Sequence, residues 1–273
     1  MNGAAGASEA IALGPWQVGG AAALVLVAGV ISLALRLKLE GQLLLGMARA
    51  TVQLLLVGWA LEWIFAQTHL ALTFAALGVM TLAATRAALK RSQWTVDGGF
   101  LGAFATLVCT AGVMAVFGGA VLVGAEPWYA PRYALPLLGM LLGNGLTGLS
   151  LCLDSLLGAF ADDRARIELD LALGATRWEA ARDPLRRAVR RGIVPIVNAM
   201  MVAGIVSLPG MMTGQILAGA SPVEAVKYQL LILFLIAAST SLGCLGVGFF
   251  AVRRILDAAH RIRGERIHAR GDA

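Results

Sequence analysis

Seven long apolar runs, separated by short polar segments, set the main constraint on how this chain can fold. A helix of about 20 apolar residues is long enough to cross the hydrocarbon core of a bilayer. In lipid only a helix or a closed barrel satisfies its backbone, and the alternating pattern of barrel strands is absent from the sequence. The sequence therefore predicts an all-α, polytopic membrane protein with seven transmembrane helices, all plain except the sixth. The runs are Val18–Leu35, Leu43–Phe65, Leu70–Ala88, Gly98–Val123, Tyr133–Leu157, Ile193–Leu217 and Val226–Val252.

Composition supports the same class. Of the 273 residues, 59% are hydrophobic and 14% are charged, against roughly 25% charged in an ordinary soluble domain. This balance excludes a soluble enzyme, a disordered chain and a fibrous protein. The net charge of +6 is carried by arginines between apolar runs, so we assign it to the lipid bilayer and not to nucleic acid. The three cysteines are isolated within apolar runs and are expected to be buried as small apolar residues.

The positive charges predict an orientation. Of the 22 Lys and Arg residues, 19 lie after, or within the last turn of, the first, third, fifth or seventh run. Cytoplasmic loops carry such an excess, so the N-terminus is expected outside and the C-terminus in the cytoplasm. The expected organisation is an extracytoplasmic tail (1–17), a transmembrane domain (18–252) with a cytoplasmic loop (158–192), and a basic cytoplasmic tail (253–273).

No segment of the chain has the pattern of a nucleotide or metal enzyme. A P-loop requires a Gly-Lys-Ser/Thr step, but each of the three lysines follows Leu or Val. The three histidines are scattered and form no HExxH helix. We therefore expect no catalytic site and no cofactor on this chain.

The loop 158–192 has the pattern of two helices with a break between them. Gly174 is suited to end the first helix and Thr176 to cap the second. Permease subunits of ABC transporters carry an acidic residue six positions before a Gly-Ala step, as Glu168 stands here before Gly174 and Ala175. Such a short helix can dock in a groove of an ATPase. An arginine-rich loop that only holds topology is the alternative. The docking candidates are Glu168, Asp170, Gly174, Ala175, Thr176 and Trp178.

The sixth run contains Pro209-Gly210, which predicts a break in the helix at that step. Irregular backbone at membrane depth is tolerated only where protein or a water-filled cavity covers it, so this segment and Ser207 are candidates for a transport pathway. Met211 and Met212 are weak candidates for binding a soft metal. Gap-filling at a helix interface is the more ordinary role of such methionines.

Polar residues inside other runs indicate faces that avoid lipid. Arg49 and Gln53 lie one turn apart in the second run, and Asn144 lies mid-span in the fifth. They are candidates for substrate contact, or for polar contacts that hold the bundle together. We also expect Arg49 to pair with Asp154 near the inner face.

Several of these segments together resemble one family. Gly204–Gly219 with Ser221–Gln229, Arg49–Gln53 with Gly58, Gly139–Asn144 and Leu171–Thr176 are similar to the FetB-type permeases. These are membrane subunits of a bacterial ABC system for iron export, and they resemble plant permeases linked to aluminium tolerance. The resemblance implies two permeases, expected to be a homodimer, with two cytoplasmic ATPase subunits that bind ATP and Mg²⁺. It leaves the cargo open between iron, another metal and a nucleotide sugar.

Two other classes were weighed against a permease. A gradient-driven secondary transporter is expected to bury acidic residues at mid-span, but Glu62, Asp154 and Glu224 lie near the ends of their runs. An intramembrane enzyme needs convergent catalytic groups, and Ser207 and Lys227 have no partner in register. Transport direction, and whether the two permeases are identical, are left open by the sequence.

Overall fold

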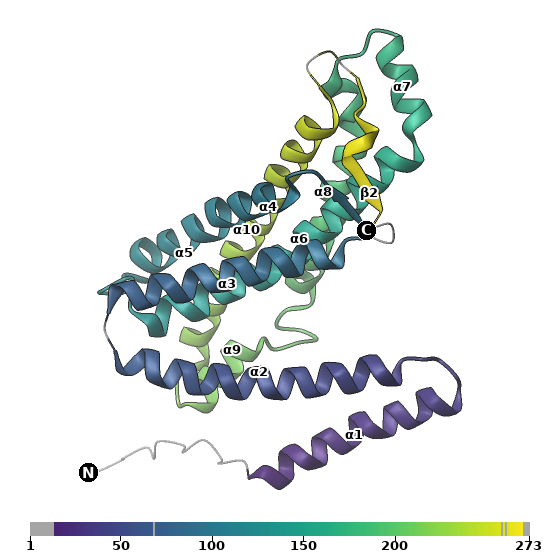
Figure 1. The fold of residues 1–273 in the computed structure, drawn as a ribbon. Helices are drawn as coiled ribbons and strands as arrows, with labels where there is room; N and C mark the ends of the chain where they lie inside the picture. The colour runs from purple at the N-terminus through teal and green to yellow at the C-terminus, as the bar shows by residue number, and fades with distance from the viewer. Residues whose placement is uncertain (1–13, 68, 258, 260, 270–273) are drawn as a thin grey trace, which may run out of the picture. The chain divides into compact units, whose positions relative to one another are not determined.

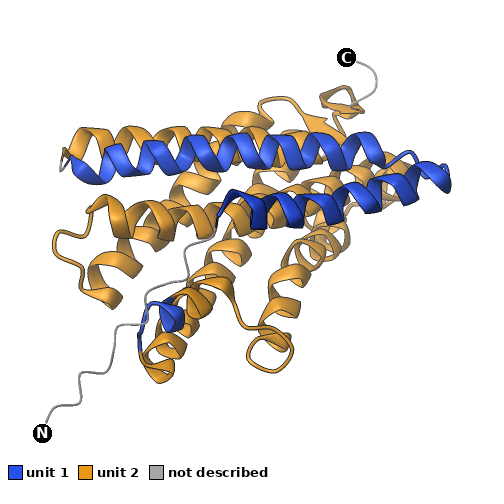
Figure 2. Cartoon of the chain, turned by 90° about the horizontal axis from the view of Figure 1, so that it is seen from below, with its two compact units in different colours: residues 1–68, 215–220 blue, residues 69–214, 221–273 orange. Residues whose placement is uncertain are grey.

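The computed structural model describes residues 14–67, 69–257, 259 and 261–269. The chain forms two compact units, residues 1–68 with 215–220 and residues 69–214 with 221–273 (Figure 2). Most of the expected extracytoplasmic tail lies outside the described residues. Each unit is described in turn.

The first unit is a helical hairpin of α1 (Pro15–Ala34) and α2 (Glu40–Ala66), which lie side by side in Figures 1 and 2. Pro15 opens α1, where its missing N–H costs nothing. The buried Ser32 hydroxyl donates to Glu40 Oε2 at 3.0 Å and accepts from the Leu39 amide at 3.1 Å, which fixes the connection. No residue of α2 is buried, so its apolar surface is left for lipid or protein to cover.

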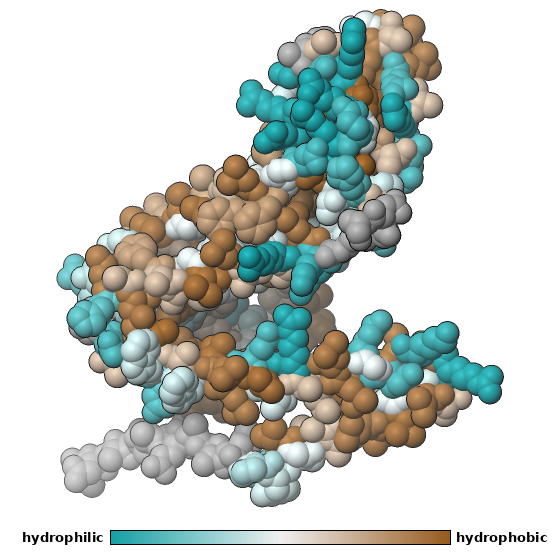
Figure 3. Space-filling model, viewed as in Figure 1, coloured by the Kyte–Doolittle hydropathy of each residue, from teal (hydrophilic) through white to brown (hydrophobic). Residues whose placement is uncertain are grey.

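The second unit is built around α6 (Pro131–Asp162), α8 (Arg177–Val202) and α10 (Pro222–Ile255), with α3 (Leu70–Arg91) packed against α6. At 1.5 Å per residue, α6 and α10 are about 48 and 51 Å long, well beyond a hydrocarbon core of about 30 Å. Both helices therefore extend past the membrane. In Figure 3 the hydrophilic side chains of this unit gather around α7 (Arg164–Ala172) and the start of α8.

Glycine permits the closest helix crossing in this core. A Cβ on Gly192 of α8 would lie 2.7 Å from the carbonyl oxygen of Gly148 on α6 and 2.6 Å from Cys244 Sγ on α10. Small residues allow such close approach of helices in membranes. Cys152 and Cys244 are fully buried here, as predicted, whereas Cys109 is exposed, contrary to the prediction.

The fourth run departs from the expected plain helix. It consists of α4 (Gly99–Leu107), a π-helical turn (Val108–Gly112), α5 (Val113–Val116) and a second π-helical segment (Phe117–Val123). A Cβ on Gly118 would lie 2.5 Å from Leu235 Cδ1 of α10. The wider turn therefore occurs where the backbone passes close to a neighbouring helix.

The sixth run is also reorganised. α8 ends at Val202, Ala203–Pro209 is non-helical, and α9 (Gly210–Leu217) follows across the boundary between the units. The predicted break is therefore present and extends from Ala203 to the proline of the Pro-Gly step. Pro209 directly precedes α9, where a proline needs no hydrogen bond of its own, and Gly210 is the first residue of that helix. The Pro209 carbonyl accepts from the Thr213 amide at 3.1 Å.

Six of the seven predicted spans are long and apolar enough to cross a membrane, and the seventh crossing stays a prediction. The structure also contains a short sheet that an all-α prediction misses. Strand β1 (Trp94–Val96) follows α3 and pairs antiparallel with β2 (Ile267–Ala269) near the C-terminus, with Thr95 opposite His268. The basic tail is therefore partly structured.

Candidate functional site

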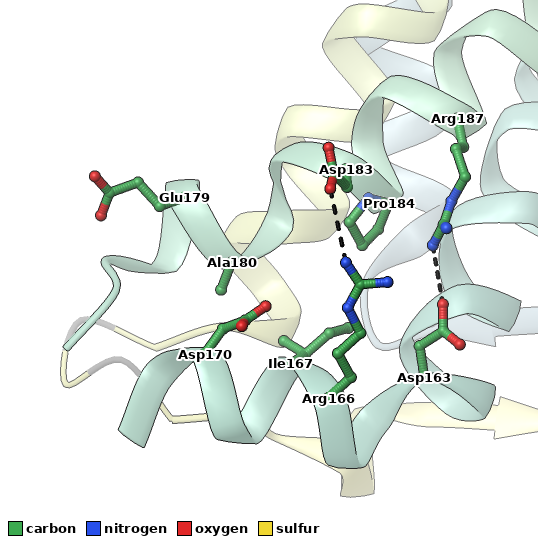
Figure 4. Close-up of a pocket in the computed structure, with 9 residues that line it drawn as sticks. All are labelled: Asp163, Arg166, Ile167, Asp170, Glu179, Ala180, Asp183, Pro184 and Arg187. Carbon is green, nitrogen blue, oxygen red and sulfur yellow. Dashed lines mark hydrogen bonds and ion pairs between the residues drawn. The ribbon is translucent and has the colours of Figure 1, made fainter. Parts of the chain in front are cut away.

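The predicted docking loop is an elbow formed by α7, the turn Leu173–Thr176 and the start of α8 (Figure 4). It is almost entirely helical, and it continues directly from α6 into α8. The expected break between two helices lies at Leu173–Thr176, and a second break at Asp163 separates α7 from α6. The loop is therefore a rigid projection instead of a flexible connection.

Gly174 ends α7 as predicted. Its φ of +96° lies in the left-handed region, which side chains disfavour. The Ala175 amide donates to the Asp170 carbonyl at 3.0 Å and the Gly174 amide to the Leu171 carbonyl at 3.1 Å. These two bonds form a Schellman motif, which satisfies the last carbonyls of the helix.

Thr176 caps α8 as predicted, with a partner that the sequence reading missed. The Glu179 amide donates to Thr176 Oγ1 at 3.3 Å, while Glu179 Oε2 accepts from the Thr176 amide at 2.8 Å. Two hydrogen bonds lower the pKa of the Glu179 carboxyl. The bond from the Thr176 amide has the larger effect, and the bond from the Thr176 hydroxyl has the smaller one. The Thr-x-x-Glu spacing is the signature of a capping box and was available in the sequence.

Ion pairs and one buried side chain join α7 to α8. Arg187 Nη2 lies 2.9 Å from Asp163 Oδ2, and Arg166 Nη2 lies 3.9 Å from Asp183 Oδ2, as Figure 4 shows. Ile167 is buried beneath them. Each exposed pair contributes little alone, but together they align the two helices.

The outer surface of the elbow is apolar with an acidic rim. Leu173 is 78% exposed and Leu169 is 58% exposed, next to the candidates Glu168 and Asp170. Glu168 accepts a bond from Arg164 Nε at 2.8 Å. Large apolar side chains on a polar projection are typical of a protein contact.

Trp178, a docking candidate, also contacts a transmembrane helix. Its ring packs edge-on against Phe249 of α10, with centroids 5.5 Å apart, and the Arg177 guanidinium lies 5.4 Å from its centroid. Trp178 therefore joins the start of α8 to α10.

The segment around the sixth run forms the second candidate region. Gly204 has a φ of +83°, and its amide donates to the Ser207 carbonyl at 2.9 Å. Met211 is half-buried and packs against the hydrophobic core, which favours the gap-filling role, and Met212 is half-buried. Among the described residues, no group of three His, Cys, Asp or Glu is placed to hold a metal ion.

The polar residues that were candidates for substrate contact are divided between the two units. Arg49 and Gln53 are exposed on α2, whereas Asn144 lies on α6 and donates to the Met140 carbonyl at 2.9 Å. Asp154 accepts from the Gln93 amide at 2.8 Å. Its predicted pairing with Arg49 stays a prediction, because the two residues belong to different units.

Sequence reasoning also missed Arg91 and Thr147. Arg91 Nη1 donates to Thr147 Oγ1 at 3.2 Å, which places a guanidinium on the same polar stripe of α6 as Asn144. The spacing of Asn144 and Thr147, one turn apart, was a usable signal.

The six long apolar helices found among the described residues define a multi-pass integral membrane protein. Residues 15–256 match the family model described as uncharacterised protein family UPF0014, and the chain belongs to this family. It is 36% identical over 211 residues to a UPF0014 membrane protein of Synechocystis (77% of this chain, 82% of that protein). It is 30% identical over 239 residues to the probable iron export permease protein FetB of Escherichia coli (88% and 91%).

A plant relative matches as well. The chain is 32% identical over 209 residues to the protein ALUMINUM SENSITIVE 3 of Arabidopsis thaliana, covering 77% of this chain and 75% of that protein. The resemblance to FetB-type permeases and their plant relatives is thus confirmed. No solved structure matches the chain.

Proposed function

We propose that the chain is the membrane permease subunit of an ABC transporter, powered by a separate cytoplasmic ATPase that binds ATP and Mg²⁺. The observation that carries the proposal is the elbow. A short helix stopped by Gly174 and braced by α8 presents exposed Leu169 and Leu173 beyond the membrane-spanning helices. Such a projection can transmit closure of an ATPase dimer without bending.

Strand pairing supports the seven-span topology. Between β1 and β2 the chain has three segments able to span a membrane, namely Gly99–Val123, Pro131–Asp162 and Pro222–Ile255. Three crossings would place the two strands on opposite sides, where they cannot pair. Counting residues 193–217 as a fourth crossing places both strands on one side. The excess of Lys and Arg assigns that side to the cytoplasm.

The relatives indicate only the chemical class of the cargo. The E. coli relative is named as a probable iron export permease, so we propose a metal ion as the cargo, moved by a homodimer of permeases in the bacterial inner membrane. ATP binding by the partner then shifts the balance between two accessible states of the permease. The Trp178–Phe249 contact links the elbow to α10 in this scheme.

The test is co-purification in mild detergent followed by an ATPase assay. Leu173→Asp is expected to lose the nucleotide-binding partner, because a charge replaces an apolar side chain at the centre of the contact. Ile205→Asp, at an 89% exposed position in the sixth-run break, is the matched control and is expected to retain it. Retention of the partner by Leu173→Asp would remove the elbow from the interface. A folded chain that transports without ATP would favour a gradient-driven transporter.

A further inference from the structure

A basic groove lies where α3 ends, beside the β1–β2 pair and the start of α4. It has a volume of about 550 Å³ and is lined by Arg86, Lys90, Thr95 and His268, with Leu89 and Phe100 among its apolar members. Nothing in the proposed transport mechanism uses it. None of the described residues lining it is acidic, although Asp97, next to it, lies 3.1 Å from His268 Nε2.

Arg86 and Lys90 both line this groove because their spacing of four residues places them on the same face of α3. Arg86 and Lys90 are one helical turn apart, an arrangement in which like charges repel. Among the described residues, Arg86 makes no ion pair, and its side chain is exposed. An anion bound between them would remove this repulsion.

The position of the groove selects the kind of anion. Arg86 lies within the last two turns of an apolar helix, where a long side chain extends toward the headgroup region. Phe100 is 40% exposed at the start of α4 and offers an apolar wall beside the charges. Basic pockets at the cytoplasmic ends of transmembrane helices bind anionic lipid headgroups.

We propose that this groove binds the phosphate of an anionic phospholipid of the inner leaflet. Arg86 and Lys90 hold the phosphate, and Thr95 and His268 border it from the two strands. The first acyl carbons lie along Leu89 and Phe100. Since His268 belongs to β2, the lipid joins the C-terminal strand to α3. The site depends on the end of α3 being at the membrane surface and is independent of ATPase docking.

The test is a titration of the purified full-length chain with phosphatidylglycerol, followed by native mass spectrometry, with phosphatidylcholine as the neutral lipid. The double variant Arg86→Gln/Lys90→Gln is expected to bind phosphatidylglycerol ~30-fold more weakly, from the usual weight of two basic residues beside an anionic headgroup. The matched control Arg132→Gln/Lys227→Gln removes two charges at other helix starts and is expected to bind as the wild type does. Equal weakening in both variants, or equal binding of phosphatidylcholine, would overturn the proposal.

Two further arms separate lipid from soluble phosphate. Phe100→Ala, which leaves every charge in place, is expected to weaken binding of the lipid and leave that of glycerol 3-phosphate unchanged. Displacement of the lipid by glycerol 3-phosphate at equal concentration would show that the groove takes a soluble phosphate and would overturn the assignment to lipid. Thr95→Val provides a milder change that keeps the groove testable if the double variant fails to fold.

Discussion

Substitution of Gly192 by alanine tests the close crossing of α6, α8 and α10. The new Cβ would lie 2.7 Å from a backbone oxygen of α6 and 2.6 Å from Cys244 Sγ, both well inside normal contact. Overpacking a core costs about 1–3 kcal/mol, and a clash with backbone belongs at the upper end. For a chain of this size each kcal/mol is worth about 2–4 °C, so the melting temperature is expected to fall by about 6–12 °C.

The assay is thermal unfolding of the detergent-solubilised protein, followed by tryptophan fluorescence. Gly143→Ala is the matched control, since it lies on α6 with no atom within 4 Å of its Cβ position. It is expected to melt at the wild-type temperature or slightly above, because alanine favours a helix. Adding Cys244→Ala to Gly192→Ala should restore only part of the loss, because the backbone clash remains. A Gly192→Ala protein that melts with the wild type would refute the close crossing.

Four further predictions concern the elbow, β1 and topology. Thr176→Ala should destabilise the start of α8 by about 0.5–2 kcal/mol, measured as faster hydrogen exchange there; unchanged exchange would contradict the capping box. Because the pKa of Glu179 is lowered in the fold, its stabilising effect is present above the ordinary Glu pKa and is lost as pH falls through the folded value, so the protection of the elbow amides relative to their intrinsic exchange rates should fall in acid. Asp154→Ala should cost about 0.5–1.5 kcal/mol by removing the acceptor of the exposed Gln93 amide, measured by thermal unfolding, with Asp154→Asn expected to retain part of the stability and an unchanged melting temperature contradicting the contact. Ser207→Cys should react with an impermeant thiol reagent from outside the cell, in a background where the three native cysteines are replaced by alanine; labelling only from inside would contradict seven spans.

The features that depend on short stretches of sequence could be predicted. The six apolar helices follow from length and hydropathy, and the ends of α7 and α8 follow from Gly174 and Thr176, whose effects act within a few residues. The capping partner Glu179 was equally local and was overlooked.

The remaining features depend on tertiary contacts. The β1–β2 pair joins three-residue strands that lie far apart in the sequence, and neither strand has enough pattern to be recognised alone. The helix α8 continues through Pro184 and Pro195, although proline usually interrupts a helix; Pro184 is buried, so packing outweighs local preference there. The π-helical turns occur where neighbouring helices approach closely, which a single segment cannot reveal.

The pairing of β1 with β2 has a consequence for biosynthesis. A chain is made from its N-terminus, so β1 emerges long before its partner and must wait until α10 has been inserted. In the proposed seven-span topology four crossings separate β1 from β2, so a chain that fails to insert one of these four leaves the two strands on opposite sides of the membrane. The pairing of these two short strands therefore reports whether the second half of the chain has been inserted with the proposed topology.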